Sequence, residues 1–296
     1  MNEQMEILMS AGRGLEYPKE YGKINLWMDK RHTIDTEAAS RQWDNVYRCV
    51  KFCIGDANIR LIQKQQAFPD MIFVRNAGLV IPDLGDYDSA RAGERKKRII
   101  LSSFKNKERQ GEREFYRRWF EQNGFEIIVL PMGVTFEGGG EAVWWKDTMF
   151  FGHGFRAPND TAVHLEYALA KAEVPAKTIS LKLVDERFYH LDTAFMPIRG
   201  DGKTTDDVLV YYPGAFDRDA QKIIEGLPIE RLEVTEKDAC AFGCNLLALG
   251  NNIIIAKGTE NLPRHLKERK FIVCELNMDE IKKGGGSIYC MTLNLS

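Results

Sequence analysis

Several features that would assign a class of function are missing from this 296-residue sequence. No run of about 18 apolar residues is present, which argues against a membrane-spanning helix. The formal net charge of −2 provides no basic surface for nucleic acid or for an anionic membrane. Residues 1–4 lack the basic and apolar regions of a secretory signal peptide, so we expect a cytoplasmic protein.

The motifs of common hydrolases are also missing. The sequence has no Gly-x-Ser-x-Gly, no His-Glu-x-x-His and only five histidines. Six cysteines in a chain of this length do not form a disulfide framework, and the pairs Cys49/Cys53 and Cys240/Cys244 have no evident third or fourth metal ligand. We interpret these four residues and Cys274 as small buried hydrophobic side chains of a reduced protein, and we expect no metal.

What is present is a repeated alternation of helix and strand. Helical periodicity is followed by a short apolar strand five times, at a spacing of roughly fifty residues. These pairs are 36–53 with 59–62, 111–123 with 126–130, 161–172 with 178–183, 216–225 with 231–234, and 261–268 with 270–274. Further β stretches are predicted at 71–81, 98–102, 134–151, 207–212 and 246–256. The pattern predicts an α/β protein of one domain, 1–296, with a surface loop at 83–97.

The segment 283–293 carries the most informative chemistry. Cys290 follows a glycine run and opens a strand-like stretch, and glycine allows a ligand to approach the backbone closely. On a strand, His190 and Asp192 would share a face, and a base beside an anion can activate a thiol or hold a cation. Taken alone, these two residues are more typical of a structural histidine beside a surface aspartate.

Other polar residues interrupt glycine-rich or apolar segments. Glu137 and Glu141 flank three glycines, which is typical either of a tight loop that presents a carboxylate or of a polar hairpin turn. Asp70, Arg75 and Asn76 lie in an apolar stretch, where charged residues are rare unless they are paired or lie at a strand edge.

Arginines supply the third kind of candidate. Arg109 and Arg156 suit bidentate binding of a carboxylate, and a surface ion pair is the alternative for both. His153, near Arg156, is a possible ligand or base, although a loop histidine is more commonly neither.

Taken in chain order, these segments form a pattern. They are Pro69-Asp70-x-x-Phe73-x-x-Asn76-Ala77-Gly78, Glu137-Gly-Gly-Gly-Glu141, Gly152-x-Gly154-Phe155-Arg156, Phe188-Tyr189-His190-Leu191-Asp192-Thr193 and Gly285-Gly286-x-x-x-Cys290. The pattern resembles the guanidine-modifying enzymes of the pentein fold, which include arginine deiminases, glycine amidinotransferases, dimethylarginine dimethylaminohydrolases and arginine dihydrolases. The likeness extends from the segment 24–28 to Cys290. It is greatest to the arginine dihydrolases, which share a block like Phe242-Gly243-Cys244-Asn245.

This resemblance implies a fold and a catalytic group. The fold is a five-bladed α/β propeller of ββαβ units around a central active-site channel, in agreement with the five units inferred from periodicity. Cys290 matches the family's nucleophile, His190 its acid–base histidine, and Glu137 the acid that orients this histidine. The resemblance therefore places Cys290 and His190 across one central pocket.

The resemblance also implies residues that bind substrate. Asp192 matches the carboxylate that grips the guanidinium group, and Asp70 matches another polar residue at the substrate end of the site. Arg109 and Arg156 match arginines that hold the substrate α-carboxylate. Asn25 matches the asparagine of the dihydrolases' early Asn-x-Trp-Met segment.

Asn76 bears on the choice of reaction. Deiminases and dimethylaminohydrolases have aspartate at this position, whereas dihydrolase-like members have asparagine. We hypothesise that one carboxylate plus a neutral amide suits both a cationic guanidinium and the neutral ureido group left after the first loss of ammonia.

Four residues depart from the usual dihydrolase pattern. They are Glu141, Ala194, Ser287 and Tyr289. These departures leave the nucleophile and the base in place but leave the identity of the substrate open.

The sequence therefore predicts a cysteine-dependent hydrolase of arginine or a related guanidino compound. The predicted products are ammonia and ornithine, or ammonia and citrulline, and no cofactor is expected because the thiol and the imidazole carry the chemistry. Dimethylaminohydrolase and amidinotransferase activities remain alternatives, as does a pentein-like binding module without catalysis. The expected partner is a small guanidino molecule, with no nucleic acid and no membrane, and a homo-oligomer would be unsurprising.

Overall fold

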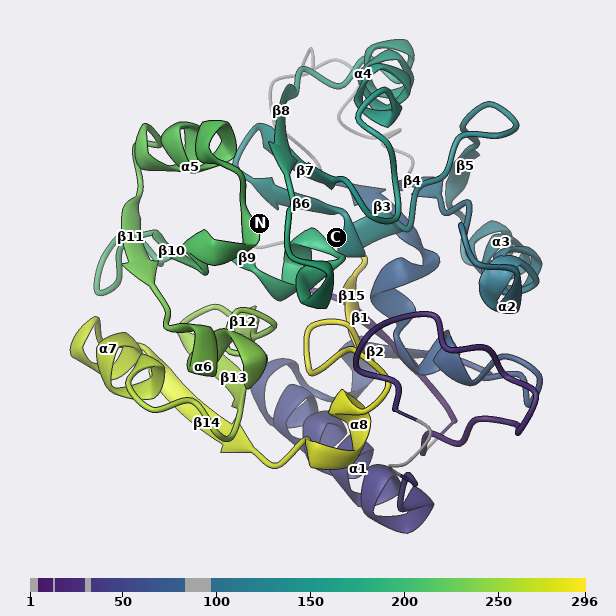
Figure 1. Cartoon of the computed structure of the whole chain (residues 1–296), viewed down its shortest axis with the longest axis horizontal. Helices are drawn as coiled ribbons and strands as arrows, with labels where there is room; N and C mark the ends of the chain where they lie inside the picture. The colour runs from purple at the N-terminus through teal and green to yellow at the C-terminus, as the bar shows by residue number, and fades with distance from the viewer. Residues whose placement is uncertain (1–4, 13, 30–32, 83–96) are drawn as a thin grey trace.

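The computed structural model describes residues 5–12, 14–29, 33–82 and 97–296. The loop predicted at 83–97 lies outside these ranges except for its last residue. Within the described residues the strands form five separate three-stranded sheets. Figure 1 shows the sheets arranged around the middle of the molecule, with most helices on the outside.

All five sheets follow one plan. The middle strand of each pairs antiparallel with one neighbour and parallel with the other. The middle strands are β1 (Ile7–Ser10), β4 (Arg98–Leu101), β7 (Thr148–His153), β10 (Val208–Tyr211) and β13 (Asn252–Ala256). Their antiparallel partners are β15 (Leu293–Asn294), β3 (Gly78–Ile81), β6 (Ala142–Trp145), β9 (Phe195–Ile198) and β12 (Leu247–Leu249). Their parallel partners are β2 (Ile59–Ile62), β5 (Glu126–Ile128), β8 (Lys177–Lys182), β11 (Glu230–Glu233) and β14 (Ile272–Leu276).

Helices connect the parallel strands, as they must in a crossover connection. The crossover helices are α1 (Thr36–Ile54), α3 (Glu112–Gln122), α4 (Thr161–Lys171), α5 (Arg218–Glu225) and α7 (Leu262–Glu268). Shorter helices are α2 (Lys107–Gln110), α6 (Glu236–Cys240) and α8 (Asp279–Lys282). The five predicted helix–strand units are thus confirmed, with small shifts at their ends.

Helix α1 illustrates how the sequence sets these elements. The Asp35 side chain accepts a hydrogen bond from the Ala38 backbone N–H at 2.9 Å, which caps the start of the helix. Gly55 follows the last residue with φ = +82°, a conformation that glycine adopts readily. Trp43 and Val46 are among the residues buried at helical spacing, so one face of the helix packs on the core.

Two predicted β stretches are partly wrong. Most of 71–81 forms two short 3₁₀ turns, Pro69–Ile72 and Val74–Ala77, before β3 begins. Within 134–151, Gly138–Gly140 is also a 3₁₀ turn. A short, continuous apolar run fits a buried turn as well as a buried strand, which is why periodicity did not separate the two. The first two turns carry Asp70 and Asn76, which line the pocket described below.

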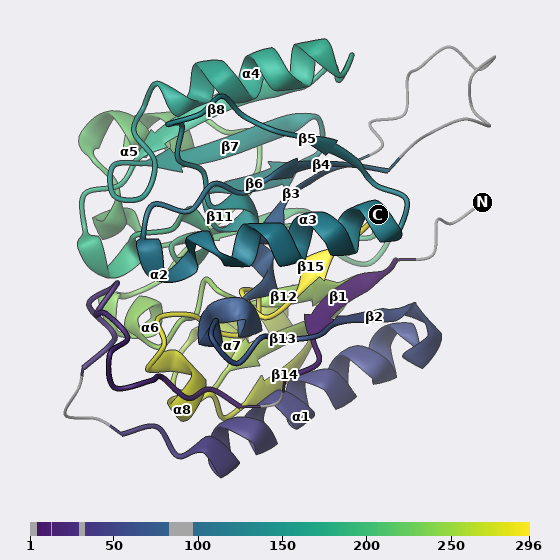
Figure 2. The ribbon, with the colours of Figure 1, turned by 90° about the vertical axis from the view of Figure 1, so that its right-hand side faces the viewer.

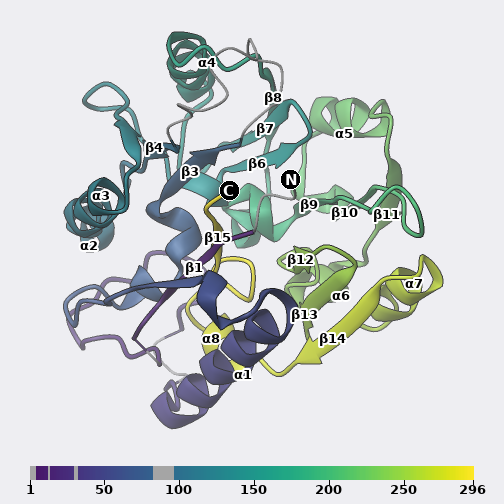
Figure 3. The same ribbon diagram turned by 180° about the vertical axis from the view of Figure 1, so that it is seen from behind.

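The two ends of the described chain meet in one sheet. Ile7 pairs with Asn294 and Leu8 with Leu293, so β15 lies beside β1. Figure 3 shows β1 and β15 near the middle of the molecule. Figure 2 shows that the C-terminal end and α8 lie on opposite sides of the molecule. Among the described residues, no helix is long and apolar enough to cross a membrane.

Candidate active site

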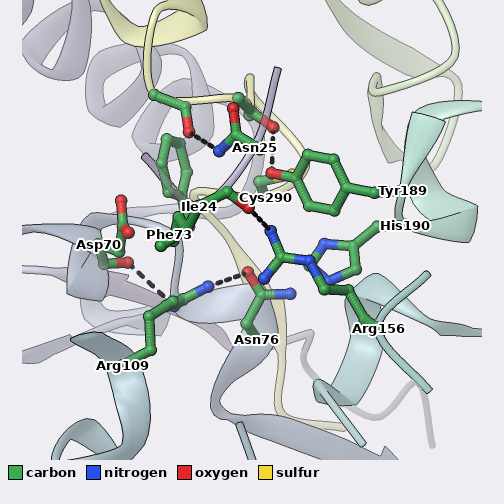
Figure 4. A pocket seen from close by; sticks show the side chains of 13 residues that line it. Ile24, Asn25, Asp70, Phe73, Asn76, Arg109, Arg156, Tyr189, His190 and Cys290 are labelled. Atoms are coloured by element: carbon green, nitrogen blue, oxygen red, sulfur yellow. Dashed lines mark hydrogen bonds between the residues drawn. The ribbon is translucent and has the colours of Figure 1, made fainter. Parts of the chain in front are cut away.

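A narrow pocket, with a cavity volume of about 10 Å³, lies beside the glycine loop that follows α8. Segments from along the whole chain line it: Ile24, Asn25, Asp70, Phe73, Asn76, Arg109, Arg156, Tyr189, His190, Gly284, Gly285, Gly286 and Cys290. Figure 4 shows these side chains converging on one space. The expectation that Cys290 and His190 share a pocket is confirmed.

Cys290 lies in a turn that precedes β15, and not at the start of a strand as the sequence suggested. Its Sγ is 3.3 Å from Asp192 Oδ2, and Asn245 Nδ2 donates to it at 3.1 Å. Burial and the charge of Asp192 raise the pKa of the Cys290 thiol well above its ordinary value, and the Asn245 donor opposes this. In the empty pocket, Cys290 is therefore a thiol that donates to Asp192.

The Asp192 carboxyl group is fully buried, and only one of its two oxygens has a hydrogen-bond partner among the described residues. Burial raises the pKa of this carboxyl group to about 7, whereas the Cys290 thiol, Arg75 and Asn245 lower it. Its Oδ1 atom has no hydrogen-bond partner among the described residues. A bound cation would stabilise both the carboxylate and a thiolate at this end of the pocket.

On the His190 side of the pocket, the imidazole and the carboxylate behind it already have partners. His190 Nε2 lies 2.9 Å from Glu137 Oε2. Although burial opposes ionisation of Glu137, Arg156 and His190 hold the pKa of this carboxyl group well below its ordinary value. Burial lowers the pKa of His190 to about 4, against the effect of Glu137. The neutral ring therefore donates its Nε2 hydrogen to Glu137 and keeps a lone pair on Nδ1.

The expected strand at His190 and Asp192 is wrong. His190 precedes a 3₁₀ turn, Leu191–Thr193, so the two side chains do not alternate as on a strand. His190 contacts Glu137, and Asp192 contacts Cys290. The turn thus delivers the two groups to different parts of the same site.

The two predicted carboxylate-binding arginines line the pocket but already have partners. Arg109 binds Glu112 through Nε and Nη2, at 2.8 Å each. Arg156 Nη1 lies 3.3 Å from both Glu137 oxygens, and its Nη2 donates to the Ile24 carbonyl at 2.7 Å. Sequence reasoning missed Glu112. Its spacing of three residues from Arg109 in a helical segment was the available signal.

Asn76 joins the two arginine systems. Its Nδ2 donates to the Glu137 carbonyl at 3.1 Å, and its Oδ1 accepts from Arg109 Nη1 at 3.0 Å. Both ends of the amide are therefore used in the empty pocket. An aspartate here would place a carboxylate oxygen against the Glu137 carbonyl.

Asp70 accepts hydrogen bonds from two tyrosines that sequence reasoning missed. Tyr17 OH donates at 2.5 Å and Tyr21 OH at 2.8 Å. Nothing in the sequence around Tyr17 and Tyr21 marks them as site residues. They hold the N-terminal loop against the pocket.

Asn25 is bonded to the glycine loop. Its Nδ2 donates to the Gly284 carbonyl at 3.0 Å, and Tyr189 OH donates to the Gly285 carbonyl at 2.8 Å. Gly285 has φ = +90°, and a Cβ on it would come within 2.6 Å of Asn25 Nδ2. Only glycine fits at this position, which explains part of the glycine run.

Asn245 is the main residue to which sequence reasoning gave no role. Its Oδ1 accepts from the backbone N–H groups of Ser287 at 3.1 Å and Cys290 at 3.2 Å. Its Nδ2 also donates to the Asp192 carbonyl at 3.1 Å. One amide thus fixes the nucleophile turn, the sulfur and the Asp192 backbone together. The sequence block 242–245, shared with dihydrolases, was the available signal.

Glu141 supports the loop instead of lining the pocket. Its Oε2 accepts from the Glu137 backbone N–H at 2.5 Å. Burial, followed by the charge of Glu137, raises the pKa of Glu141 well above its ordinary value. The glutamate side chain at this position therefore contacts the backbone of its own loop and does not extend into the pocket.

The remaining cysteines only partly match their predicted role. Cys244 is buried, but Cys49, Cys53, Cys240 and Cys274 are half-buried, because they lie on the edges of helices and of an outer strand. Within the described ranges, no group of three or more His, Cys, Asp or Glu residues is arranged to hold a metal ion.

Comparisons with known proteins agree with this geometry. The family model for N,N dimethylarginine dimethylhydrolase, eukaryotic, matches residues 21–296. The bifunctional arginine dihydrolase/ornithine cyclodeaminase ArgZ of Synechocystis is 36% identical over 301 residues. That match covers 100% of this chain and 38% of ArgZ, so the chain spans less than half of this relative's length. The N(G),N(G)-dimethylarginine dimethylaminohydrolase of Mycobacterium tuberculosis is 29% identical, over 92% of this chain and 80% of that protein.

A solved structure extends the likeness to three dimensions. The N-terminal domain of ArgZ, in a variant covalently bound to a reaction intermediate, matches with a TM-score of 0.84 and 33% identity. The match covers 99% of this chain and 98% of that chain. The resemblance inferred from the sequence is confirmed, and the chain belongs to the N,N-dimethylarginine dimethylhydrolase family.

Proposed function

We propose that this chain is a hydrolase of arginine or a related guanidino compound, acting through a covalent amidino-thioether on Cys290. The observation that carries the proposal is one narrow pocket lined by Cys290 and His190, with Asp192 and Glu137 directly behind them. We also propose that the five sheets are the blades of an α/β propeller that forms one catalytic domain over residues 1–296.

The first step begins when the guanidinium group enters the pocket. Its N–H groups satisfy the free Asp192 Oδ1, and its charge lowers the pKa of the Cys290 thiol, because a nearby cation favours the thiolate. The sulfur attacks the guanidinium carbon to form a C–S bond. His190 Nδ1 takes the thiol proton of Cys290 and passes it to the leaving nitrogen, whose bond to the carbon breaks as it departs as ammonia.

Water completes the reaction from the same side. His190 Nδ1 takes a proton from a water molecule, whose oxygen attacks the thioether carbon, and the C–S bond breaks. One cycle converts arginine and water to citrulline and ammonia. A second cycle on the ureido group, with another water, releases ammonia, carbon dioxide and ornithine.

The other lining residues place the amino-acid end of the substrate. Arg109 and Arg156 contribute positive charge for an α-carboxylate, and Asp70 and Asn25 line the same pocket. Arg156 would exchange its contact with the Ile24 carbonyl for the substrate carboxylate, which is a stronger, charge-assisted acceptor.

The identity with ArgZ over the whole chain favours arginine as substrate and two successive hydrolyses, and Asn76 supports this choice. Product analysis with arginine, methylated arginines, agmatine and guanidinoacetate tests the proposal. Ornithine with two ammonia molecules per arginine is the expected result. If the preferred reaction is release of dimethylamine from dimethylarginine, the chain is a dimethylaminohydrolase. If the amidino group is transferred to an added amine, it is an amidinotransferase.

The same experiment on Asn76→Asp tests the role of the amide. An aspartate loses the hydrogen bond to the Glu137 carbonyl and fixes a cation more strongly, so citrulline should accumulate relative to ornithine. An unchanged product ratio would sink this part of the proposal. Labelling with iodoacetamide separates enzyme from binding module: arginine should protect Cys290, and turnover should fall in step with labelling.

A further inference from the structure

Three arginines are at least nine-tenths buried in the described part of the chain: Arg75, Arg109 and Arg156, with exposures of 6%, 3% and 6%. Two of them have a buried carboxylate partner, Glu112 for Arg109 and Glu137 for Arg156. Arg75 forms no ion pair with any described residue. A buried cation without a partner is costly, so the exception is informative.

The surroundings of Arg75 leave one side of its guanidinium group available. Its Cζ lies 3.6 Å from the centre of the Tyr289 ring, so one face is stacked. Nε makes a long contact of 3.5 Å with the Tyr289 carbonyl, and Gly139 packs against the aliphatic stem. The two terminal nitrogens have no hydrogen-bond acceptor among the described residues. These are the nitrogens that form a fork with a planar carboxylate.

Arg75 lines a large cavity that is separate from the active-site pocket. The cavity has a volume of about 680 Å³ and shares no lining residue with that pocket. Its residues include β15 and the C-terminal Ser296, and Figure 2 shows this end of the chain on the side opposite to α8. The cavity therefore opens on the opposite face of the molecule from the glycine loop.

The charges and walls of this cavity suit one class of ligand. Arg199, exposed and without an ion-pair partner in the described residues, lines it together with Arg75. Lys146 also lines it, but its ammonium group is paired with Asp207 at 3.1 Å. Asp147 is the acidic side chain of the lining, and the apolar walls are Leu79, Val80, Trp144 and Leu293.

We propose that this cavity is a second binding site, which takes a small organic carboxylate with an apolar body. The carboxylate forms a bidentate pair with the terminal nitrogens of Arg75, with Arg199 adding charge at the mouth. The apolar body packs against Trp144 and the neighbouring aliphatic side chains. The site belongs to the face opposite the reaction and needs no residue of the catalytic pocket.

Benzoate and benzamide are a matched pair of probes, because they share a ring and differ in charge. Isothermal titration or ligand-observed NMR should show saturable binding of benzoate in the millimolar range or tighter, and at least about tenfold weaker binding of benzamide. Arg75→Met, which keeps an unbranched stem on Tyr289, should weaken benzoate binding by about tenfold or more. Arg199→Gln should weaken it less, and Arg218→Met, at an exposed arginine on α5, should leave it unchanged.

Alkylation of Cys290 with iodoacetamide distinguishes the two pockets. Benzoate should bind the alkylated protein as well as the free protein, because the two linings have no residue in common. Loss of binding on alkylation would mean that benzoate sits near Arg109 and Arg156, and would overturn the proposal. Equal binding of benzoate and benzamide, or full binding by Arg75→Met, would overturn it as well. If Arg75→Met does not fold, benzoate binding to the alkylated protein and to Arg199→Gln still tests the proposal.

A ligand in the cavity should change the affinity of the active-site pocket for arginine. This consequence rests on the proposed function. Arg75 is one of the charges that lower the pKa of Asp192. A carboxylate on Arg75 offsets that charge, so benzoate should raise KM for arginine near neutral pH in the wild type. Benzamide, and benzoate with Arg75→Met, should not. Binding without any effect on KM would leave the site standing and remove only this coupling.

Discussion

The two sides of the active-site pocket differ in how complete they are. On the imidazole side, His190 and Glu137 are hydrogen-bonded to each other, and Arg156 balances the charge of Glu137. On the sulfur side, Asp192 keeps one oxygen without a partner, and the pKa values of both Asp192 and Cys290 are raised. The first side is ready before substrate arrives. On the second side Cys290 is a neutral thiol, which under the proposed function a guanidinium cation would convert to the reactive thiolate.

The largest expected effect comes from breaking the complete side. Glu137→Gln removes the charge that accepts the His190 hydrogen and pairs with Arg156, so kcat should fall by about 10²- to 10⁴-fold. Steady-state kinetics with arginine measures this loss. Protection of Cys290 from iodoacetamide by arginine should survive, because the sulfur side is untouched. If Glu137→Gln loses arginine protection as well as kcat, Glu137 also affects substrate binding at Cys290, and the comparison of two independent sides is wrong.

Asp192→Asn should act in opposite directions on two measurements. Loss of the carboxylate removes a charged contact to the guanidinium, so kcat/KM should fall by about 10- to 100-fold. The same change removes the anion that raises the pKa of Cys290, so iodoacetamide should label the empty protein faster. The control is Glu141→Gln, which changes a buried acid without contact to the sulfur. Slower labelling of Asp192→Asn would contradict the proposed thiol–carboxylate pairing.

The pH dependence follows from the same group. Burial raises the pKa of Asp192 to about 7 in the empty site, so the carboxyl group is neutral below this pH and negative above it. A guanidinium cation needs the negative form, so kcat/KM for arginine should rise as the pH increases through about 7. A profile measured from about pH 5 to pH 9 checks the direction. Activity that falls across neutral pH would show that the assignment has the wrong sign.

Asn245→Asp should give a smaller effect, confined to the sulfur side. It replaces the N–H donor to Cys290 by an oxygen, so the pKa of the thiol should rise and alkylation at neutral pH should slow by about tenfold. Thermal unfolding provides the control, because Asn245 also fixes the turn through Ser287. A loss of stability without any change in alkylation would limit Asn245 to a structural role.

The smallest effect is expected at Glu141. Burial raises the pKa of its carboxyl group, which accepts from the Glu137 backbone N–H and does not line the pocket, so Glu141→Gln should change kcat/KM by no more than about twofold. A large loss of activity would show that Glu141 reaches the substrate when the site is occupied.

The sequence predicted the framework because its signals are local. The apolar spacing of α1 and the short strands that follow each helix are visible within about twenty residues. The residues at the site were named from a family pattern, since His190 and Asp192 alone were ambiguous. The resemblance correctly placed Asn25, Asp70, Asn76, Arg109 and Arg156 around Cys290 and His190.

What the sequence did not predict depends on contacts between distant segments. Asn245 reaches Cys290 across 45 positions, and Tyr17 reaches Asp70 across 53. The 3₁₀ turns at 69–72, 74–77 and 191–193 lie in segments whose local sequence suits a strand equally well. Only the packed structure decides where these backbones turn and which side chains meet.

The pairing of β15 with β1 has a consequence for the proposed site. The turn that holds Cys290 leads directly into β15, whose partner lies near the opposite end of the chain. Cys290, the proposed nucleophile, is therefore held in place by contact between the two ends of the described chain, so weakening the β1–β15 pairing should disturb the proposed site.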